Sequence, residues 1–184
     1  MTVPVPEPRP EGPSPADVAA MSAQLGRPLR GARAVAHRCR CGLPDVVETS
    51  PRLPDGTPFP TFYYLTCPRA AAAVSTLEAS GLMREMTERL GQDPELAQSY
   101  AAAHRDYLAR REAVGHVPEI AGISAGGMPE RVKCLHVLVA HALAAGPGVN
   151  PLGDEAVAAL PQWWAAGPCV DVEPARPEQQ SDEQ

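Results

Sequence analysis

The sequence is poor in aromatic residues, in lysine and in long apolar runs. Phe, Trp and Tyr make up 4% of its 184 residues, and Lys133 is the single lysine. No stretch approaches the ~20 consecutive apolar residues of a transmembrane helix, and the first 15 residues lack the pattern of a signal peptide. Nucleic-acid binding is not expected, because basic residues are not in excess and few aromatic rings could stack on bases. We therefore expect a cytoplasmic protein without a membrane span.

Acidic residues and prolines are unevenly distributed along the chain. The net charge is -6, and most of it falls in residues 171–184, so the rest of the chain is almost neutral. Six of the 22 prolines lie in the first 15 residues, which indicates an extended leader with little apolar surface. The sequence predicts one domain over residues 14–166, between a Pro-rich tail (1–13) and an acidic tail (167–184).

Short strand patterns precede a long helical region. Ser14 and Gly26 are typical of the start and end of a helix. Segments rich in β-branched and aromatic residues then predict three antiparallel strands, at residues 32–41, 45–49 and 61–66. Helical patterns follow at residues 70–80, 82–90, 94–114, 129–145 and 153–164. The predicted fold is α+β, a small three-stranded antiparallel sheet followed by a mostly helical part, in a single domain.

The cysteines form the main candidate site. On the predicted strand 32–41, Cys39 and Cys41 share a face, while Cys67 ends the third predicted strand and Cys134 lies in the first turns of the predicted helix 129–145. Four converging thiolates predict a zinc or iron–sulfur centre with a structural or redox role. Reactive thiols and buried apolar cysteines remain alternatives, because a single Cys-x-Cys pair is weak zinc spacing. Cys169 is interpreted as a bystander.

The histidines are constrained by helical geometry. Cys134 and His136 lie roughly 160° apart if both are helical, so His136 is an alternative ligand only if the helix begins later along the chain. His141 falls among Ala, Leu and Val and is predicted to be buried and hydrogen-bonded. His104 and His116 are expected to face solvent.

Two basic pairs form a candidate anion site. Arg38 and Arg40 lie in a stretch that contains no acid, and Arg131 and Lys133 follow a glycine-rich loop. Together they predict binding of an anionic or phosphorylated small molecule by an enzyme with Cys134 as its nucleophile. The alternatives are arginines lying over an exposed strand face and a flexible loop that closes onto a helix.

Several segments resemble a known bacterial family. They are CRCGLP at residues 39–44, YLTCP at 64–68 and GGMPERVKCLH at 126–136, joined by QLGR at 24–27 and GPGVNPLG at 146–153. Over about residues 17–160 the chain resembles the uncharacterised family called domain of unknown function 501. The resemblance implies a small cytoplasmic bacterial protein and brings no activity. A non-catalytic adaptor in cell-envelope or division processes, whose tails engage a partner, is a third alternative.

Overall fold

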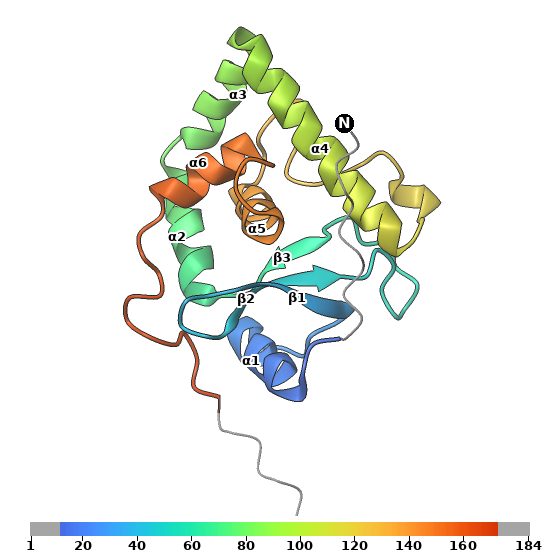
Figure 1. Cartoon of the computed structure of the whole chain (residues 1–184), viewed down its shortest axis with the longest axis vertical. Helices are drawn as coiled ribbons and strands as arrows, with labels where there is room; N and C mark the ends of the chain where they lie inside the picture. The colour runs from blue at the N-terminus through green and yellow to red at the C-terminus, as the bar shows by residue number, and fades with distance from the viewer. Residues whose placement is uncertain (1–11, 173–184) are drawn as a thin grey trace, which may run out of the picture.

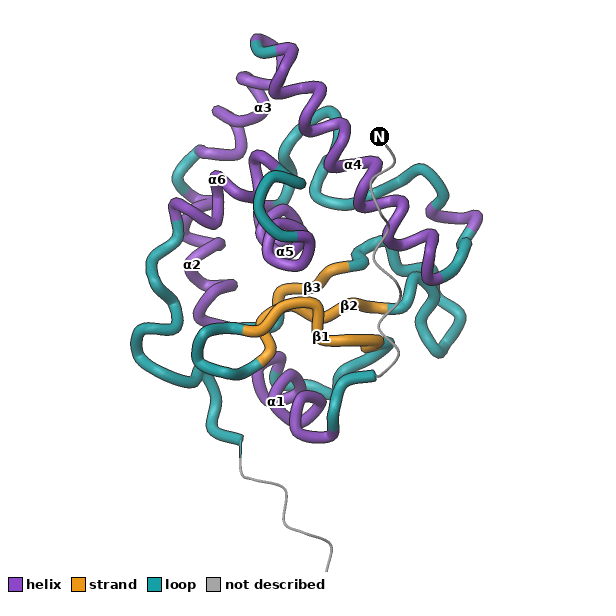
Figure 2. Tube along the Cα trace, in the orientation of Figure 1, coloured by secondary structure: helices purple, strands orange, loops and turns teal. Residues whose placement is uncertain are grey.

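The computed structural model describes residues 12–172 as a sheet of three strands surrounded by helices (Figures 1 and 2). In chain order the elements are α1 (Pro15–Leu25), β1 (Ala32–Arg38), β2 (Pro44–Thr49), β3 (Tyr63–Leu65), α2 (Pro68–Ala79), α3 (Leu82–Gln92), α4 (Pro94–Val114), the 3-10 helix η1 (Pro118–Ile120), α5 (Leu135–Ala145) and α6 (Pro151–Ala159). The predicted α+β fold is confirmed.

The sheet is antiparallel throughout, in the order β1-β2-β3. Val47 is central to its register, since it pairs with Val35 of β1 and with Tyr64 of β3. The sheet lies between two layers: α1 covers one side, and α5 packs against the other with α2, α4 and α6 around it (Figure 1). The short connections predicted this antiparallel arrangement correctly.

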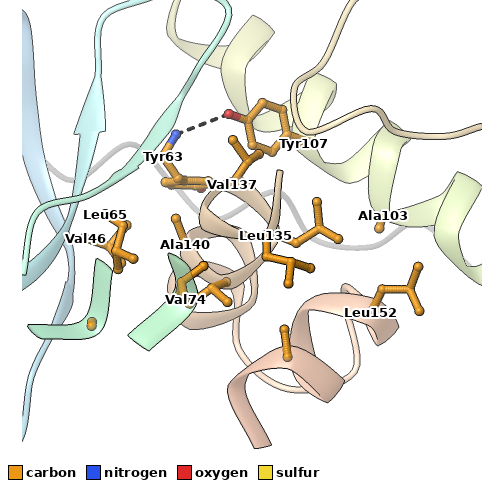
Figure 3. Close-up of a cluster of buried hydrophobic side chains, with 14 of the residues drawn as sticks. Val46, Tyr63, Leu65, Val74, Ala103, Tyr107, Leu135, Val137, Ala140 and Leu152 are labelled. Atoms are coloured by element: carbon orange, nitrogen blue, oxygen red, sulfur yellow. Dashed lines mark hydrogen bonds between the residues drawn. The ribbon is translucent and has the colours of Figure 1, made fainter. Parts of the chain in front are cut away.

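Helix α5 is the centre of the hydrophobic core. Seven of its eleven residues are buried, so the helix is apolar nearly all round. It packs against β3, α2 and α6. Figure 3 shows its Leu135, Val137 and Ala140 among side chains from the sheet and the neighbouring helices. This central position fixes where the start of α5 lies relative to the sheet and to α2.

The first strand is shorter than predicted. It ends at Arg38, and residues 39–42 form a turn in which the Gly42 N–H donates to the Cys39 carbonyl at 2.9 Å. Gly42 has a φ of 93°, a conformation that glycine adopts at no steric cost. The expectation that Cys39 and Cys41 share a strand face is therefore wrong, because the strand does not reach them.

Helix α5 begins later than predicted, at Leu135 instead of residue 129. The preceding loop is closed by its own hydrogen bonds: the Arg131 N–H donates to the Gly127 carbonyl at 3.1 Å, and the Lys133 N–H donates to the Gly126 carbonyl at 2.7 Å. A Cβ on Gly127 would approach the Arg131 carbonyl oxygen to 2.7 Å, and its φ is 92°. The glycine pair thus permits a compact turn where a helix was expected.

The predicted boundaries of the domain are only partly open to comparison. Residues 1–11 and 173–184 lie outside the described residues. They make up most of the two predicted tails, on which the adaptor hypothesis depends. At the start of the described chain, the Ser14 hydroxyl accepts the Asp17 N–H and Gly26 ends α1, as predicted. None of the helices within residues 12–172 combines the length and apolar character needed to cross a membrane.

Candidate functional site

The start of α5 brings together a thiol, an imidazole and a carboxylate. Cys134 is the residue that precedes the first helical turn, and His136 lies within that turn. Glu78 approaches from the last turn of α2, where its Oε1 accepts the Leu135 N–H at 2.7 Å and lies 3.1 Å from His136 Nδ1. A carboxylate is stable here because the first N–H groups of a helix have no partners inside the helix and carry partial positive charge.

The His136 ring has a partner at both nitrogens. Nδ1 faces Glu78, while Nε2 lies 3.1 Å from the Ala71 carbonyl oxygen and 3.4 Å from the Ser75 hydroxyl. The hydrogen bond with Cys134 and the carboxylate of Glu78 raise the pKa of His136 to about 9, against the opposing effect of burial. Without a metal, the imidazole is therefore charged at neutral pH.

These three side chains have the geometry of a metal-binding group. One ligand atom from each of Glu78, Cys134 and His136 lies within 4.8 Å of the other two, and all three side chains are half-buried. Sulfur, imidazole nitrogen and carboxylate oxygen are the ligand types that zinc takes in proteins. No other group of three or more such residues with this spacing occurs among residues 12–172.

Cys134 lies where two clefts meet. The first has a volume of about 710 Å³ and is lined largely by the glycine-rich loop of residues 122–131, with Lys133 and His104. The second has about 570 Å³ and is lined by β3, the end of α1 and His136. Thr61, Cys134 and Val137 line both. Cys134, which is half-buried, therefore borders both clefts.

The four predicted anion ligands separate into two places. Arg131 and Lys133 are exposed and line the first cleft, and neither side chain has an ion-pair partner among the described residues. Arg38 instead binds Asp17 through two contacts of 2.9 and 3.1 Å, and the Arg40 guanidinium lies 4.9 Å from the centre of the Trp164 ring. The structure thus places only the second basic pair beside Cys134.

No three of the four predicted cysteine ligands have sulfur atoms within 4.8 Å of one another. Cys39 and Cys41 lie in the β1–β2 turn and Cys67 precedes α2, whereas Cys134 belongs to the group with Glu78 and His136. All five cysteines of the chain are free. Burial raises the pKa of Cys39 to about 11 and that of Cys67 to about 12, so both are protonated thiols when no metal is bound.

Glu78 is the member of this group that sequence reasoning missed. It lies in a predicted helix, but nothing in its local pattern shows that the helix ends beside the start of α5. The condition set for His136 as an alternative ligand is met, since the helix begins at Leu135. The late start places Cys134 outside the helix, so the 160° separation does not apply.

The remaining histidines lie outside this group. His141 is fully buried and lies 2.9 Å from Asp106 Oδ2 and 3.2 Å from the Asn150 amide, as the prediction of a buried, hydrogen-bonded residue requires. His116 is exposed, as expected. His104 is half-buried and 2.8 Å from the Ser124 hydroxyl, so the prediction that it faces solvent is wrong. Burial lowers the pKa of His104.

A protein-family model matches most of the chain. The model of a family described as a protein of unknown function (DUF501) matches residues 35–158, a range that holds Cys39, Cys41, Cys67 and Cys134 and leaves Cys169 outside. No curated protein and no solved structure matches the chain.

Proposed function

The chain belongs to the DUF501 family of proteins of unknown function, and from that premise we propose that it binds a metal ion through Glu78, Cys134 and His136. The observation that carries the proposal is the group of three ligand atoms within 4.8 Å of one another at the start of α5. This ligand set keeps Cys134 and the alternative ligand His136 from the sequence prediction, and it adds Glu78.

The contacts of His136 support a role as ligand. Histidines that bind metals commonly donate their second ring N–H to a carbonyl or carboxylate, which fixes the ring and its tautomer. Here Nε2 is in position to donate to the Ala71 carbonyl, so Nδ1 remains for the metal, on the side of Glu78. The start of α5 holds Glu78 in the same way, through the Leu135 N–H.

Zinc suits this ligand set better than an iron–sulfur cluster. Clusters are held mainly by cysteine thiolates, whereas zinc accepts one sulfur, one nitrogen and one oxygen. Three protein ligands leave a fourth position open, which is typical of catalytic zinc sites. Zinc in such a site polarises a substrate oxygen or lowers the pKa of a bound water. Arg131 and Lys133, which line the adjoining cleft, favour an anionic substrate.

Metal titration of single variants tests the proposal. We expect Glu78→Gln, Cys134→Ser and His136→Gln each to weaken zinc binding by more than about 100-fold, because losing a ligand costs more than losing a group that only orients one. His116→Gln, at an exposed residue just beyond the end of α4, is the matched control and should leave the affinity unchanged. Equal affinities for the wild type and all three ligand variants in calorimetry would refute the assignment.

A second candidate function is nucleophilic catalysis by Cys134 on an anionic small molecule. It is favoured by the position of Cys134 at the junction of both clefts and ahead of the positive end of α5. The neighbouring Lys133 has no ion-pair partner among residues 12–172, so its charge is available to an anion.

Alkylation of the metal-free protein tests this candidate. We expect Cys134 to react faster with the anionic reagent iodoacetate, relative to the neutral iodoacetamide, than Cys41 does. Lys133→Ala should lower this ratio at Cys134 and leave it unchanged at Cys41, as followed by mass spectrometry of peptides. The same ratio at both cysteines would count against an anion-binding cleft at the thiol.

A further inference from the structure

The chain beyond α6 folds back against α2, the β1–β2 turn and α1. The Arg69 guanidinium donates to the Gly167 carbonyl at 2.8 Å, and the Trp164 ring lies under Arg40 of the β1–β2 turn. Two residues beyond Gly167, the Cys169 sulfur accepts a hydrogen bond from Gln24 Nε2 at 3.3 Å. Figure 1 shows this segment passing the turn and the lower end of α2. Residues 164–169 therefore contact three elements that are distant in sequence.

The first residues of β2 lie at the centre of these contacts. On one side, the Cys39 N–H donates to the Leu43 carbonyl at 2.9 Å. On the other side, the Thr66 N–H donates to the Asp45 carbonyl at 2.8 Å, and Thr66 is followed directly by Cys67. Gln24 links the start of β2 to the chain beyond α6, because its Nε2 donates to the Pro44 carbonyl at 2.7 Å and also contacts the Cys169 sulfur.

The four cysteines around this strand end form two pairs. Cys41 interacts with Cys39, and Cys169 interacts with Cys67. Burial is the main cause that raises the pKa of Cys39 and of Cys67; Cys169 raises that of Cys67 further, whereas Cys41 lowers that of Cys39 through its backbone N–H and raises it through its thiol. Cys39 and Cys67 are buried in one core cluster, and Cys41 and Cys169 pack against it half-buried. The members of each pair therefore lie close together. One pair lies beyond the end of β1 and the other beyond the end of β3, so the two pairs flank the start of β2.

Buried polar atoms without partners occur beside the same cysteines. Within the described residues five buried side-chain nitrogen or oxygen atoms have no hydrogen-bond partner, and three of them belong to Gln24, Asp45 and Thr66. Asp45 is fully buried, and its Oδ2 has no partner, although Oδ1 contacts His37 at 2.6 Å. A buried carboxylate oxygen is costly unless positive charge lies near it. The buried surroundings of the cysteines are therefore polar, and the His37 ring is the partner of the Asp45 carboxylate there.

We propose a second, closed metal centre in which one zinc ion is bound by the thiolates of Cys39, Cys41, Cys67 and Cys169. Four cysteine ligands are typical of structural zinc sites, which contribute directly to folding. The ion would fasten residues 164–169 to the β1–β2 turn and to the start of α2. Cys169 replaces Cys134 in the predicted set of four ligands.

Binding draws the two pairs together. No three of these sulfurs lie within 4.8 Å of one another, so side-chain rotation must close the site. Cys41 follows the end of β1 in a turn, and Cys169 lies beyond the last helix, so neither is held by a helix or a sheet. Four thiols lose four protons to solvent as one Zn²⁺ binds, which makes the affinity strongly dependent on pH.

Zinc content per chain tests this centre separately from the site of Glu78, Cys134 and His136. Full-length protein purified without chelator should contain two zinc ions. Cys169→Ser and Cys41→Ser should each lose one ion and keep the other, and Glu78→Gln should show the complementary loss. If only the proposed function fails, the wild type holds one ion, and that ion is lost in Cys169→Ser.

Thermal unfolding gives a second readout. A strong chelator should lower the melting temperature of the wild type and of Glu78→Gln, and it should have a much smaller effect on Cys169→Ser. These variants avoid the fully buried Cys67, whose replacement could prevent folding. The proposal is overturned if Cys169→Ser and Cys41→Ser retain the metal content of the wild type. Iron with sulfide in place of zinc, or a Cys67–Cys169 disulfide in a metal-free protein, also overturns it.

Discussion

Removing one hydroxyl group, in Tyr107→Phe, should destabilise the start of β3, the strand that lines the second cleft. The Tyr107 hydroxyl accepts the backbone N–H of Phe62 at 2.6 Å and that of Tyr63 at 3.4 Å, the second of which Figure 3 draws. Tyr107 and Phe62 are almost completely buried, so water cannot replace the lost acceptor. Phenylalanine keeps the ring and leaves no cavity, which isolates the hydrogen bonds.

The expected cost follows from the donors left without a partner. A buried, unsatisfied N–H costs about 1–3 kcal/mol, and the shorter contact carries most of the effect, so we expect the free energy of unfolding to fall by about 2 kcal/mol. Urea titration measures it, and the m-value should stay unchanged because the surface exposed on unfolding is the same.

The matched control is the neighbouring Tyr64, which is half-buried and whose hydroxyl has no hydrogen-bond partner among residues 12–172. Tyr64→Phe should change the free energy of unfolding by less than about 0.5 kcal/mol. A loss for Tyr107→Phe that is no larger than that of the control would refute the reasoning.

Two further predictions concern helix packing and pH. Gly153→Ala should destabilise the protein by about 1–3 kcal/mol in urea titration, because a Cβ there would overlap the Leu138 carbonyl of α5. The control Gly91→Ala should be neutral or stabilising, since a Cβ at that position meets nothing within 4 Å. Equal effects of the two substitutions would contradict the close packing of α5 and α6. The zinc affinity of the Cys169→Ser protein should rise as pH increases from 6.5 to about 9. The metal must displace the proton of His136, whose pKa is raised to about 9 by Cys134 and Glu78. A zinc affinity that calorimetry finds constant over this pH range would count against His136 as a ligand.

Local sequence signals predicted the parts of the fold that local physics decides. Ser14 and Gly26 fixed the ends of α1, and short connections rich in turn residues predicted the antiparallel sheet. The late start of α5 was missed because it depends on hydrogen bonds made by Gly126 and Gly127 within a compact loop, whereas Pro129 alone is typical of a helix start.

The candidate site was predictable only in part. Cys134 and His136 stand two residues apart, so the sequence could nominate both. Glu78 lies more than 50 residues away, and only the packing of α2 against α5 brings it to them. Cys169 was set aside for a similar reason, because its contact with Gln24 joins the two ends of the described chain. Contacts of this kind arise from tertiary packing, which no short pattern records.

The central claim is a metal ion held by Glu78, Cys134 and His136, and cobalt titration tests it most directly. Cobalt replaces zinc in such sites and reports a sulfur ligand by its visible and near-ultraviolet absorption. In Cys169→Ser protein, which lacks the second centre, one equivalent of Co²⁺ should give an intense tetrahedral spectrum with a thiolate charge-transfer band. The added change Cys134→Ser should abolish that band. A spectrum identical to that of cobalt in buffer would contradict the account.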